Sequence, residues 1–555
     1  MPEYLAPGVY VEEIPFRSKS IEGVGTSTAG FIGPCGYGSV AGPSLHVASL
    51  AEFECFFDAG AALAFATTAS PDSTSTTENF LWHAVRAFFA EGGKRLFVSR
   101  VFRPLAGDYP PTSPVVDLGG AGTPRWSDGH GRHSSGALNV RARFPGAAGN
   151  LIVRLALQPP APGGPTRATT LTVEVSSADG SRVLGRWNGL SPNPAQTATD
   201  AADSIFARFA AELPADEPSR WTPVIFDPPA SAGIGAADLL ADWFSLDPAA
   251  IPGANVTREI RLAGGNDGLL PRAAEYAGTT GAGAGFKTGL AQFEDEDDIS
   301  IVAAPGATAR HADDPSGAEA IADLLVAHAE RMRYRIAVLD SPPGADIAGV
   351  RQWRARLDSS RAALYYPWVT IKDPNAARDL DLPPSGFIAG IYARTDIQRG
   401  VFKAPANEVV TLAVKFEREI TLAEQGQLNP LGINCLRFLP GHGYRVWGAR
   451  TLGSDPDWKY VNLRRYFIYL EHSIDRGIGW VVFEPNGEAL WARVRQSIGD
   501  FLFLEWRNGA MQGSTPKDAY FVKCDRDTMT QDDLDNGRLI CVIGVAAVKP
   551  AEFVI

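Results

Sequence analysis

The stretch DGHGRH, at residues 128–133, holds residue types that could bind a metal ion. It places Asp128, His130 and His133 at spacings that one ion could use. A metal site needs several converging ligands, but the polar loop here offers no fourth one, and the chain carries no HExxH motif. We therefore interpret this stretch as a solvated loop and expect no metal.

The stretch GAGAGFKTGL, at residues 281–290, resembles a phosphate-binding loop. In such loops a lysine directly follows a glycine, so that the ammonium group and the backbone amides converge on the phosphates. Here Phe286 separates Gly285 from Lys287. The sequence therefore favours a flexible glycine-rich connection, and we expect no nucleotide cofactor.

Two acidic runs also lack the pattern of a binding site. Residues 294–298 read EDEDD and residues 525–537 read DRDTMTQDDLDNG, without the glycine and the alternating ligands of a calcium loop. We interpret both as solvated turns or helix N-termini. The chain has no GxSxG elbow, and its eight histidines show no spacing that indicates a catalytic triad. We expect no enzyme.

Composition disfavours several other classes of protein. The net charge of −12 disfavours a generic binder of nucleic acid or of anionic membranes. No apolar run approaches the roughly 18 residues of a membrane span, and the first residues lack the features of a signal peptide. We expect a soluble chain, made in the cytoplasm and not inserted in a membrane. Its five widely spaced cysteines, an odd number, indicate reduced and buried thiols.

The hydrophobic pattern predicts an α/β (α+β) fold interrupted by a β-rich insertion. A helical stretch at residues 77–93 precedes a strand-like run, and buried strands at 299–306 and 334–344 flank a helix at 318–332, which indicates a doubly wound sheet. Between these parts, proline and glycine become frequent and apolar residues alternate with polar ones. The expected domains are an N-terminal arm at 1–20, core segments at 21–105 and 259–439, the insertion at 106–258, a C-terminal inner domain at 440–535, and a C-terminal strand and arm at 536–555.

Both ends of the chain read as strands that have no evident partner. GVYVEEI, between Pro7 and Pro15, alternates apolar and polar residues, but no pairing strand follows it closely. The last residues, AEFVI, carry apolar side chains to the end of the chain. A free apolar end exposes surface worth roughly 1.5 to 3 kcal/mol per side chain, so such ends are usually held down.

Seven strings of a recognisable kind follow one another along the chain and together span residues 4–555. They are YLAPGVYVEEIP, IEGVGTSTAGFIG, LAGGNDG, SSRAALYYPWV, PPSGFIAGIYARTDIQRGVFKAPAN, INCLRFLPGHGYRVWGARTL and VAAVKPAEFVI. These strings are similar to those of the contractile tail sheath family, which builds the sheaths of phage tails and of contractile injection systems. The insertion is covered least, with FPGAAGN its one string of this kind. The resemblance does not separate a phage from an injection system, although GVGTSTAGFIG and the length look more like the latter.

This resemblance implies a structural subunit of a helical sheath of many copies, surrounding an inner tube and joined to baseplate and terminal cap proteins. It implies assembly in the bacterial cytoplasm, as part of a phage tail or tail-like particle. Both chain ends would add strands to neighbouring copies, which is β-strand addition. The residues implied in these arms are Val9, Tyr10, Val11, Ile14, Phe553, Val554 and Ile555.

Two C-terminal helices suggest a surface that grips the tube. Each helix has one apolar face. In the first helix this face consists of Leu463, Phe467, Leu470 and Ile474. In the second it consists of Leu490, Val494, Ile498 and Phe501. We hypothesise that a basic ridge on an opposite face contacts an acidic tube. The candidate residues are Arg465, Arg476, Arg493 and Arg507.

A different class of function stays open at this point. The β-rich insertion could carry the site of a hydrolase or of a carbohydrate-binding protein. The residues that could form such a site are Trp126, His130, His133 and Trp187. The insertion could also bind a host structure in addition to a sheath role.

Overall fold

The computed structural model divides the chain into two compact units. The larger comprises residues 25–465, and the smaller comprises 466–555 with residues up to 24. The described residues are 20–57, 59–67, 74–105, 128–158, 170–193, 203–210, 221–229, 234–253, 255–280 and 287–553. The predicted arm residues Val9, Tyr10, Val11, Ile14, Val554 and Ile555 lie outside them.

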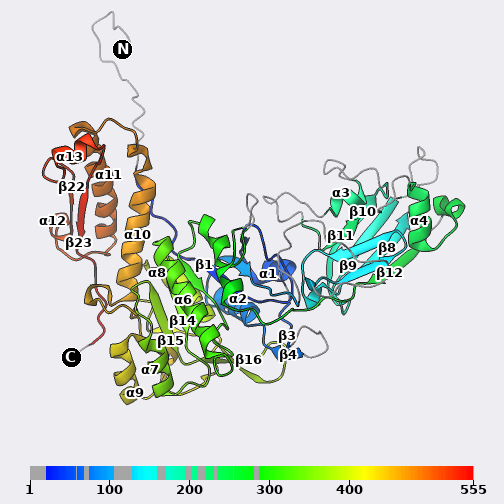
Figure 1. The fold of residues 1–555 in the computed structure, drawn as a ribbon. Coiled ribbons are helices and arrows are strands. Elements are labelled where there is room, and N and C mark those ends of the chain that lie inside the picture. Colours follow the sequence, from blue (N-terminus) through cyan, green and yellow to red (C-terminus); the bar gives the residue numbers. More distant parts are fainter. Residues whose placement is uncertain are drawn as a thin grey trace, which may run out of the picture. The chain divides into compact units, whose positions relative to one another are not determined.

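A nine-stranded sheet forms the centre of the larger unit (Figure 1). Six neighbouring strands run parallel. They are β20 (Ile433–Leu439), β15 (Ala362–Tyr366), β14 (Ile336–Asp340), β13 (Ile301–Ala303), β1 (Thr28–Gly33) and β5 (Arg95–Arg100). Antiparallel strands complete the sheet, with β2 (Leu45–Val47) beside β5, and β21 (Gly443–Val446) and β18 (Glu408–Val409) beyond β20.

Helices cover both faces of this sheet, as the predicted doubly wound arrangement requires. Side chains alternate along β1, so that Phe31 joins one core and Ile32 the other. The first core includes residues of α2 (Phe80–Ala90) and α8 (Ser385–Arg399), and the second includes residues of α6 (Pro315–Met332) and α7 (Ile347–Ala355).

Close contact between α2 and α8 depends on two glycines. A Cβ atom on Gly386 would lie 2.6 Å from the Cα of Ala84, and one on Gly390 would lie 2.6 Å from the carbonyl oxygen of Phe88. Both distances are too short for real contacts, so only glycine lets the two helix backbones approach this closely.

The insertion forms two further sheets with a core of their own, which includes Val153, Val173 and Trp243. Its strands are β6 (Arg132–Ser135), β7 (Leu138–Ala142), β8 (Ile152–Gln158), β9 (Thr170–Ser176), β10 (Val183–Leu190), β11 (Val224–Asp227) and β12 (Thr257–Arg261), and its helices are α3 (Ile205–Arg208) and α4 (Ala236–Phe244). Because β12 pairs with β8, the insertion runs to about residue 262 and not to the predicted 258.

The remaining elements of the larger unit are short. They are α1 (Leu50–Phe56), β3 (Leu63–Ala66), β4 (Thr74–Thr77), α5 (Ala273–Ala277), β16 (Val369–Lys372), β17 (Asp379–Leu382), β19 (Lys415–Phe416) and α9 (Leu422–Leu428). The predicted boundary at residue 440 differs from the structure, because β21 pairs with β20 inside the central sheet. The division between the units falls instead between Arg465 and Tyr466.

The smaller unit holds a two-stranded sheet beside a long helix (Figure 1). Its elements are most of α10 (Val461–Gly477), then α11 (Glu488–Arg507), α12 (Pro516–Ala519), β22 (Tyr520–Lys523), α13 (Gln531–Asp535) and β23 (Val542–Val545). The predicted apolar face of α11 is confirmed, because Leu490, Val494, Ile498 and Phe501 are all buried. Of the helices in the described part of the chain, none combines the length and apolar character needed to cross a membrane.

The prediction that Arg465 lies on a solvent-facing ridge is wrong. Its side chain is 3% exposed and forms a buried ion pair with Asp396 of α8, with Nη1 at 2.9 Å from Oδ1 and Nη2 at 2.6 Å from Oδ2. Nη2 also donates to the carbonyl oxygen of Thr26. Helix α10 is buried on several sides at its start, where Arg464 is buried too, so its amphipathic pattern did not identify a solvent face.

We predict that Asp396→Ala strongly destabilises the larger unit. The substitution leaves the Arg465 guanidinium buried without its carboxylate, which costs about 3 to 5 kcal/mol of unfolding free energy. The joint replacement Asp396→Leu with Arg465→Met removes both charges and should cost less. Chemical denaturation measures both effects.

A matched control is Arg526→Ala in the exposed pair of Arg526 with Glu488, where the side chains are 78% and 72% exposed. It should cost less than about 1 kcal/mol. An Asp396→Ala protein as stable as this control would contradict a structural role for the buried pair.

Candidate functional site

The central sheet has the topology of a ligand-binding fold. Strand β5 lies on one side of β1, and β13 lies on the other. In doubly wound sheets, ligands bind beyond the carboxyl ends of strands at such a switch point. A small-molecule site would therefore be expected at the edge of the sheet where β1, β13 and β14 end.

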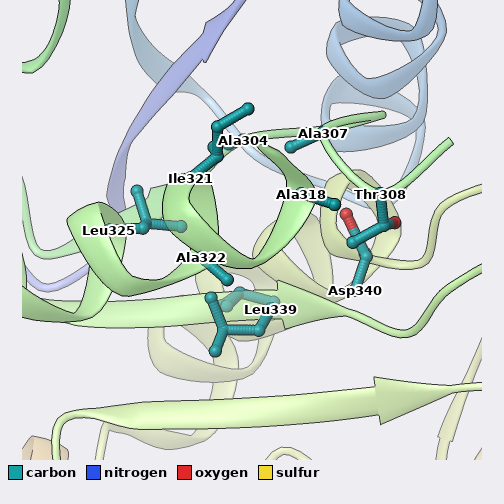
Figure 2. Close-up of a pocket in the computed structure, with 10 residues that line it drawn as sticks. Ala304, Ala307, Thr308, Ala318, Ile321, Ala322, Leu325, Leu339 and Asp340 are labelled. Atoms are coloured by element: carbon teal, nitrogen blue, oxygen red, sulfur yellow. The ribbon is translucent and has the colours of Figure 1, made fainter. Parts of the chain in front are cut away.

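The cavity beside the ends of β13 and β14 is too small for a substrate. Its volume is about 20 Å³, and a buried water already needs roughly 10 to 15 Å³ measured with a water-sized probe. Figure 2 shows its lining, with alanines and leucines of α6 and β14 and the side chains of Thr308 and Asp340 at one side. Such a cavity holds no more than about one water molecule.

Asp340 forms hydrogen bonds with the first residue of α8. Its carboxylate accepts hydrogen bonds from the backbone N–H and the hydroxyl of Ser385, each at 2.7 Å. Burial raises the pKa of Asp340 to about 7, although both hydrogen bonds act to lower it. The side chain therefore fixes the N-terminus of a helix, and its perturbed pKa follows from burial without a ligand.

In the insertion, the candidate metal ligands and catalytic residues do not surround a common site. His130 is buried, and its Nδ1 lies 2.9 Å from the carbonyl oxygen of Ala142. Burial lowers the pKa of His130 to about 4, so the ring is neutral at pH 7. Asp128 is paired with Arg132. Across the described ranges, no group of three or more histidine, cysteine, aspartate or glutamate side chains could hold a metal ion.

The two tryptophans of the hydrolase or carbohydrate-binding alternative, Trp126 and Trp187, give it no support. Trp187 packs edge-on against Phe209 with ring centroids 5.0 Å apart, and Trp126 lies outside the described residues. Lys287, from the glycine-rich stretch, donates to Asp295 at 2.8 Å. These contacts are structural, and a functional site has to be sought on the surface.

The sheet of β22 and β23 is a surface feature to which another chain could add a strand. Ala546 donates its backbone N–H to the directly opposite Ala519 at 2.8 Å, which marks a hydrogen-bonded position at the end of the ladder, while the Ala546 carbonyl accepts from Gln512 at 2.7 Å. Because such pairs alternate in an antiparallel sheet, Phe521 with Gly544 and Lys523 with Val542 are hydrogen-bonded pairs as well. We name this sheet the acceptor sheet.

The same alternation determines which main-chain N–H and C=O groups form no hydrogen bond between β22 and β23. The N–H and C=O groups of Val522 point away from β23, and those of Ile543 and Val545 point away from β22. The N–H of Tyr520 also faces away from β23, but it donates to the carbonyl oxygen of Pro516 in α12. Among the described residues, no third strand pairs with β22 or β23 themselves, although an isolated antiparallel bridge joins Met511 to Ala547 just beyond β23. Each edge of the acceptor sheet therefore presents donors and acceptors to an incoming strand.

One face of the acceptor sheet is anchored to α11. The Tyr520 hydroxyl donates to the carbonyl oxygen of Gly499 at 3.2 Å. On the other face Phe521 is 56% exposed and Val542 is 45% exposed. A two-stranded sheet is marginally stable by itself and gains from a third strand or a helix. The acceptor sheet has the helix, and its exposed apolar side chains and open edges can bind further strands.

Regular pairing ends soon after the acceptor sheet, with an isolated antiparallel bridge of Ala547 to Met511. Val548 still donates to the carbonyl oxygen of Ala510 at 3.3 Å, but residues 549–553 form no helix or strand. Phe553, one of the predicted arm residues, is 70% exposed. An exposed phenylalanine at this position is available to a neighbouring molecule.

Three of the four predicted basic residues lie on the surface. Arg476, Arg493 and Arg507 are exposed. Arg493 pairs with Glu484 at 3.1 Å, and its guanidinium lies 5.2 Å from the ring centroid of Trp480. Their role in tube contact stays a prediction.

The turn between α10 and α11 shows a feature that sequence analysis missed. Phe483 is fully exposed with a backbone φ of 68°, and its neighbour Val482 is 65% exposed. A positive φ is uncommon for a bulky residue. The run GWVVF reads as a buried segment, so no signal in the sequence indicates its exposure.

Comparisons with known sequences agree on one family. Residues 279–452 match the phage tail sheath protein central domain, and residues 453–555 match the phage tail sheath C-terminal domain. A protein described as a prophage major tail sheath protein in Pseudomonas aeruginosa strain UCBPP-PA14 is 27% identical over 258 residues, covering 45% of this chain. The tail sheath protein of Burkholderia phage BcepMu is 28% identical over 145 residues, covering 24% of this chain. The matches span 62% and 30% of these relatives.

Solved structures share the fold. The helical sheath of the anti-feeding prophage in its contracted state matches with a TM-score of 0.53 and 21% identity, over 100% of this chain and 98% of the other. The sheath tail protein from Desulfitobacterium hafniense matches with a TM-score of 0.54 and 13% identity, over 93% of both chains. At this identity the likeness establishes the fold alone.

Proposed function

Because this chain belongs to the contractile tail sheath family, we propose that it is a structural subunit that polymerises helically around an inner tube and contracts to drive the tube through a target envelope. The observation that carries the proposal is the acceptor sheet, whose two edges are open among the described residues. Both chain ends supply strand-like sequences, GVYVEEI and AEFVI. Each copy would then carry a sheet edge that can bind a strand and chain ends that can supply one. Repeated on every copy, these two features are sufficient to form a polymer.

The energetics of such a link suit a lattice. A donated strand of about seven residues can form about five or six main-chain hydrogen bonds, each contributing roughly 0.5 to 1.5 kcal/mol. Ordering the donated residues opposes this gain by about 1 to 2 kcal/mol per residue. Each link is therefore weak, and many simultaneous links stabilise the assembled sheath through effective concentration.

Contraction in this proposal moves stiff bodies that are joined by the arms. The larger unit is suited to act as a stiff body, because its central sheet is packed on both faces. The chain leaves this unit after Arg465 and enters it at Gly25. Close to both points, Asp396 binds Arg465 and accepts a 2.7 Å hydrogen bond from the Thr26 hydroxyl. We propose that this carboxylate fastens both chain connections when force acts on them.

The proposed role is mechanical and needs no catalytic step. Its partners would be further copies of the chain, an inner tube protein, and baseplate and cap proteins. The comparisons that suggest these assemblies include a baseplate and a contracted helical sheath of the anti-feeding prophage. Assembly would occur in the cytoplasm, giving part of a phage tail or a phage tail-like particle.

The first test removes residues 1–14, which include the predicted donor strand. We expect the truncated subunit to stay folded and to lose the ability to grow long cylinders, because each copy then lacks one inter-subunit strand. Negative-stain electron microscopy of the purified protein, with the full chain as control, measures cylinder length. Cylinders of normal length from the truncated chain would contradict the proposal.

The second test blocks one edge of the acceptor sheet. In Val545→Pro the lost N–H is one that points away from β22, so the hydrogen bonds between β22 and β23 remain. We expect a folded subunit, with the missing bond and the proline ring weakening each interface by about 1 kcal/mol or more. Circular dichroism reports folding and microscopy reports cylinder yield.

Val545→Thr is the matched control, because threonine keeps the N–H group and favours strands. It should form cylinders as the unmodified chain does. If Val545→Pro also assembles normally while folded, the outer edge of β23 does not accept a strand.

The third test concerns the grip on the inner tube. Reversing charge in the double variant Arg493→Glu and Arg507→Glu alters exposed side chains of α11, so the fold should be kept. On co-assembly with the tube protein we expect empty sheaths, because the electrostatic attraction to an acidic tube becomes repulsion. Arg526→Glu, outside α11, is the control and should give filled sheaths. Filled sheaths from the double variant would remove this surface from consideration.

A further inference from the structure

Two cysteines stand opposite each other at the end of the acceptor sheet. The last residues paired between its strands are Lys523 and Val542. In an antiparallel register the next pair outward is Cys524 with Cys541. These residues come from either end of the segment that contains α13, and the sequence gives no sign of their pairing because fifteen or more residues separate them.

The alternation of hydrogen bonds decides the geometry of this pair. Lys523 with Val542 is a hydrogen-bonded pair, so Cys524 with Cys541 is a non-hydrogen-bonded one. At such positions the Cα atoms lie about 4.5 Å apart and the side chains are at their closest. Disulfides need Cα separations of about 4.4 to 6.8 Å. A pair with the usual spacing of this position falls inside the window for a disulfide.

Neighbouring contacts hold both backbone segments in place. Arg495 of α11 donates a hydrogen bond to the carbonyl oxygen of Cys524, and the Thr528 hydroxyl donates to the carbonyl oxygen of Ile540 at 2.9 Å. Cys524 is buried and Cys541 is half-buried. Burial raises the pKa of the Cys541 thiol to about 12, and the neighbouring Cys524 thiol adds to this increase.

We propose that Cys524 and Cys541 form a reversible disulfide when the protein meets a low-molecular-weight disulfide such as oxidised glutathione. The thiolate of the more exposed Cys541 attacks one sulfur of glutathione disulfide, forming a mixed disulfide and releasing one glutathione thiolate. The thiolate of Cys524 then attacks the Cys541 sulfur and releases the second glutathione. The protein loses two hydrogens, and the small disulfide is reduced to two thiols.

The disulfide would act on the acceptor sheet itself. It closes the loop from Cys524 to Cys541 and ties β22 to β23 in register, so it restricts the unfolded chain and stabilises the strand pair. In a reducing compartment the thiols stay reduced, and in an oxidising medium the bond persists. Because both thiol pKa values are raised, the reaction is slow near pH 7 and faster at higher pH.

The test uses the full purified chain incubated with either oxidised or reduced glutathione at pH 8.5. Remaining thiols are blocked with iodoacetamide, and the peptides are mapped by mass spectrometry after proteolysis. We expect a peptide pair joined through Cys524 and Cys541 in the oxidised sample alone, reversed by dithiothreitol and accompanied by a higher melting temperature. Exposed Cys55 should carry glutathione or the blocking group, and it serves as the internal control.

Cys541→Ser should abolish the linked peptides, and the rise in melting temperature should vanish with them. Cys55→Ser should change neither result. If Cys524 and Cys541 remain separately blocked in the folded oxidised protein, or if either links to a different cysteine, the proposal fails. The readout requires a folded subunit and no cylinders, so it is independent of whether the chain assembles as a sheath.

Discussion

Main-chain groups that have no strand partner at the edges of the acceptor sheet are the constraint on which the proposed association of this protein depends. A strand edge exposes N–H and C=O groups that water can satisfy, but that another strand can satisfy with side-chain burial in addition. The acceptor sheet consists of two strands supported by one helix, and each strand has an outer edge. Its incompleteness within one chain gives a physical reason for many copies to associate.

The larger unit shows the opposite property. Its central sheet is covered on both faces, and the topology that binds ligands in other proteins surrounds a cavity of about 20 Å³ here. Asp340, whose pKa is raised to about 7 by burial, binds the start of α8 and not a substrate. A perturbed pKa therefore reflects rigid packing in this unit, and packing of this kind suits a body that transmits force.

A buried ion pair and a pair of neighbouring thiols determine the strength of individual connections. The pair of Arg465 with Asp396 holds the start of α10 to α8, and the loss of one partner costs more than the pair itself contributes. The opposed Cys524 and Cys541 offer a bond whose presence follows the surrounding redox conditions. The first connection is permanent, while the second can be made after the chain has folded.

The sequence by itself determined the alternation of strands and helices, the apolar face of α11, and the family strings, because these depend on residues close together along the chain. Only the tertiary structure decided that β21 joins the central sheet, that Arg465 is buried, and that Cys524 faces Cys541. Burial on several sides of α10 and the register of distant strands arise from long-range packing. Local periodicity reports one buried face at a time, and it therefore misassigned Arg465 and gave no sign of the exposed Phe483.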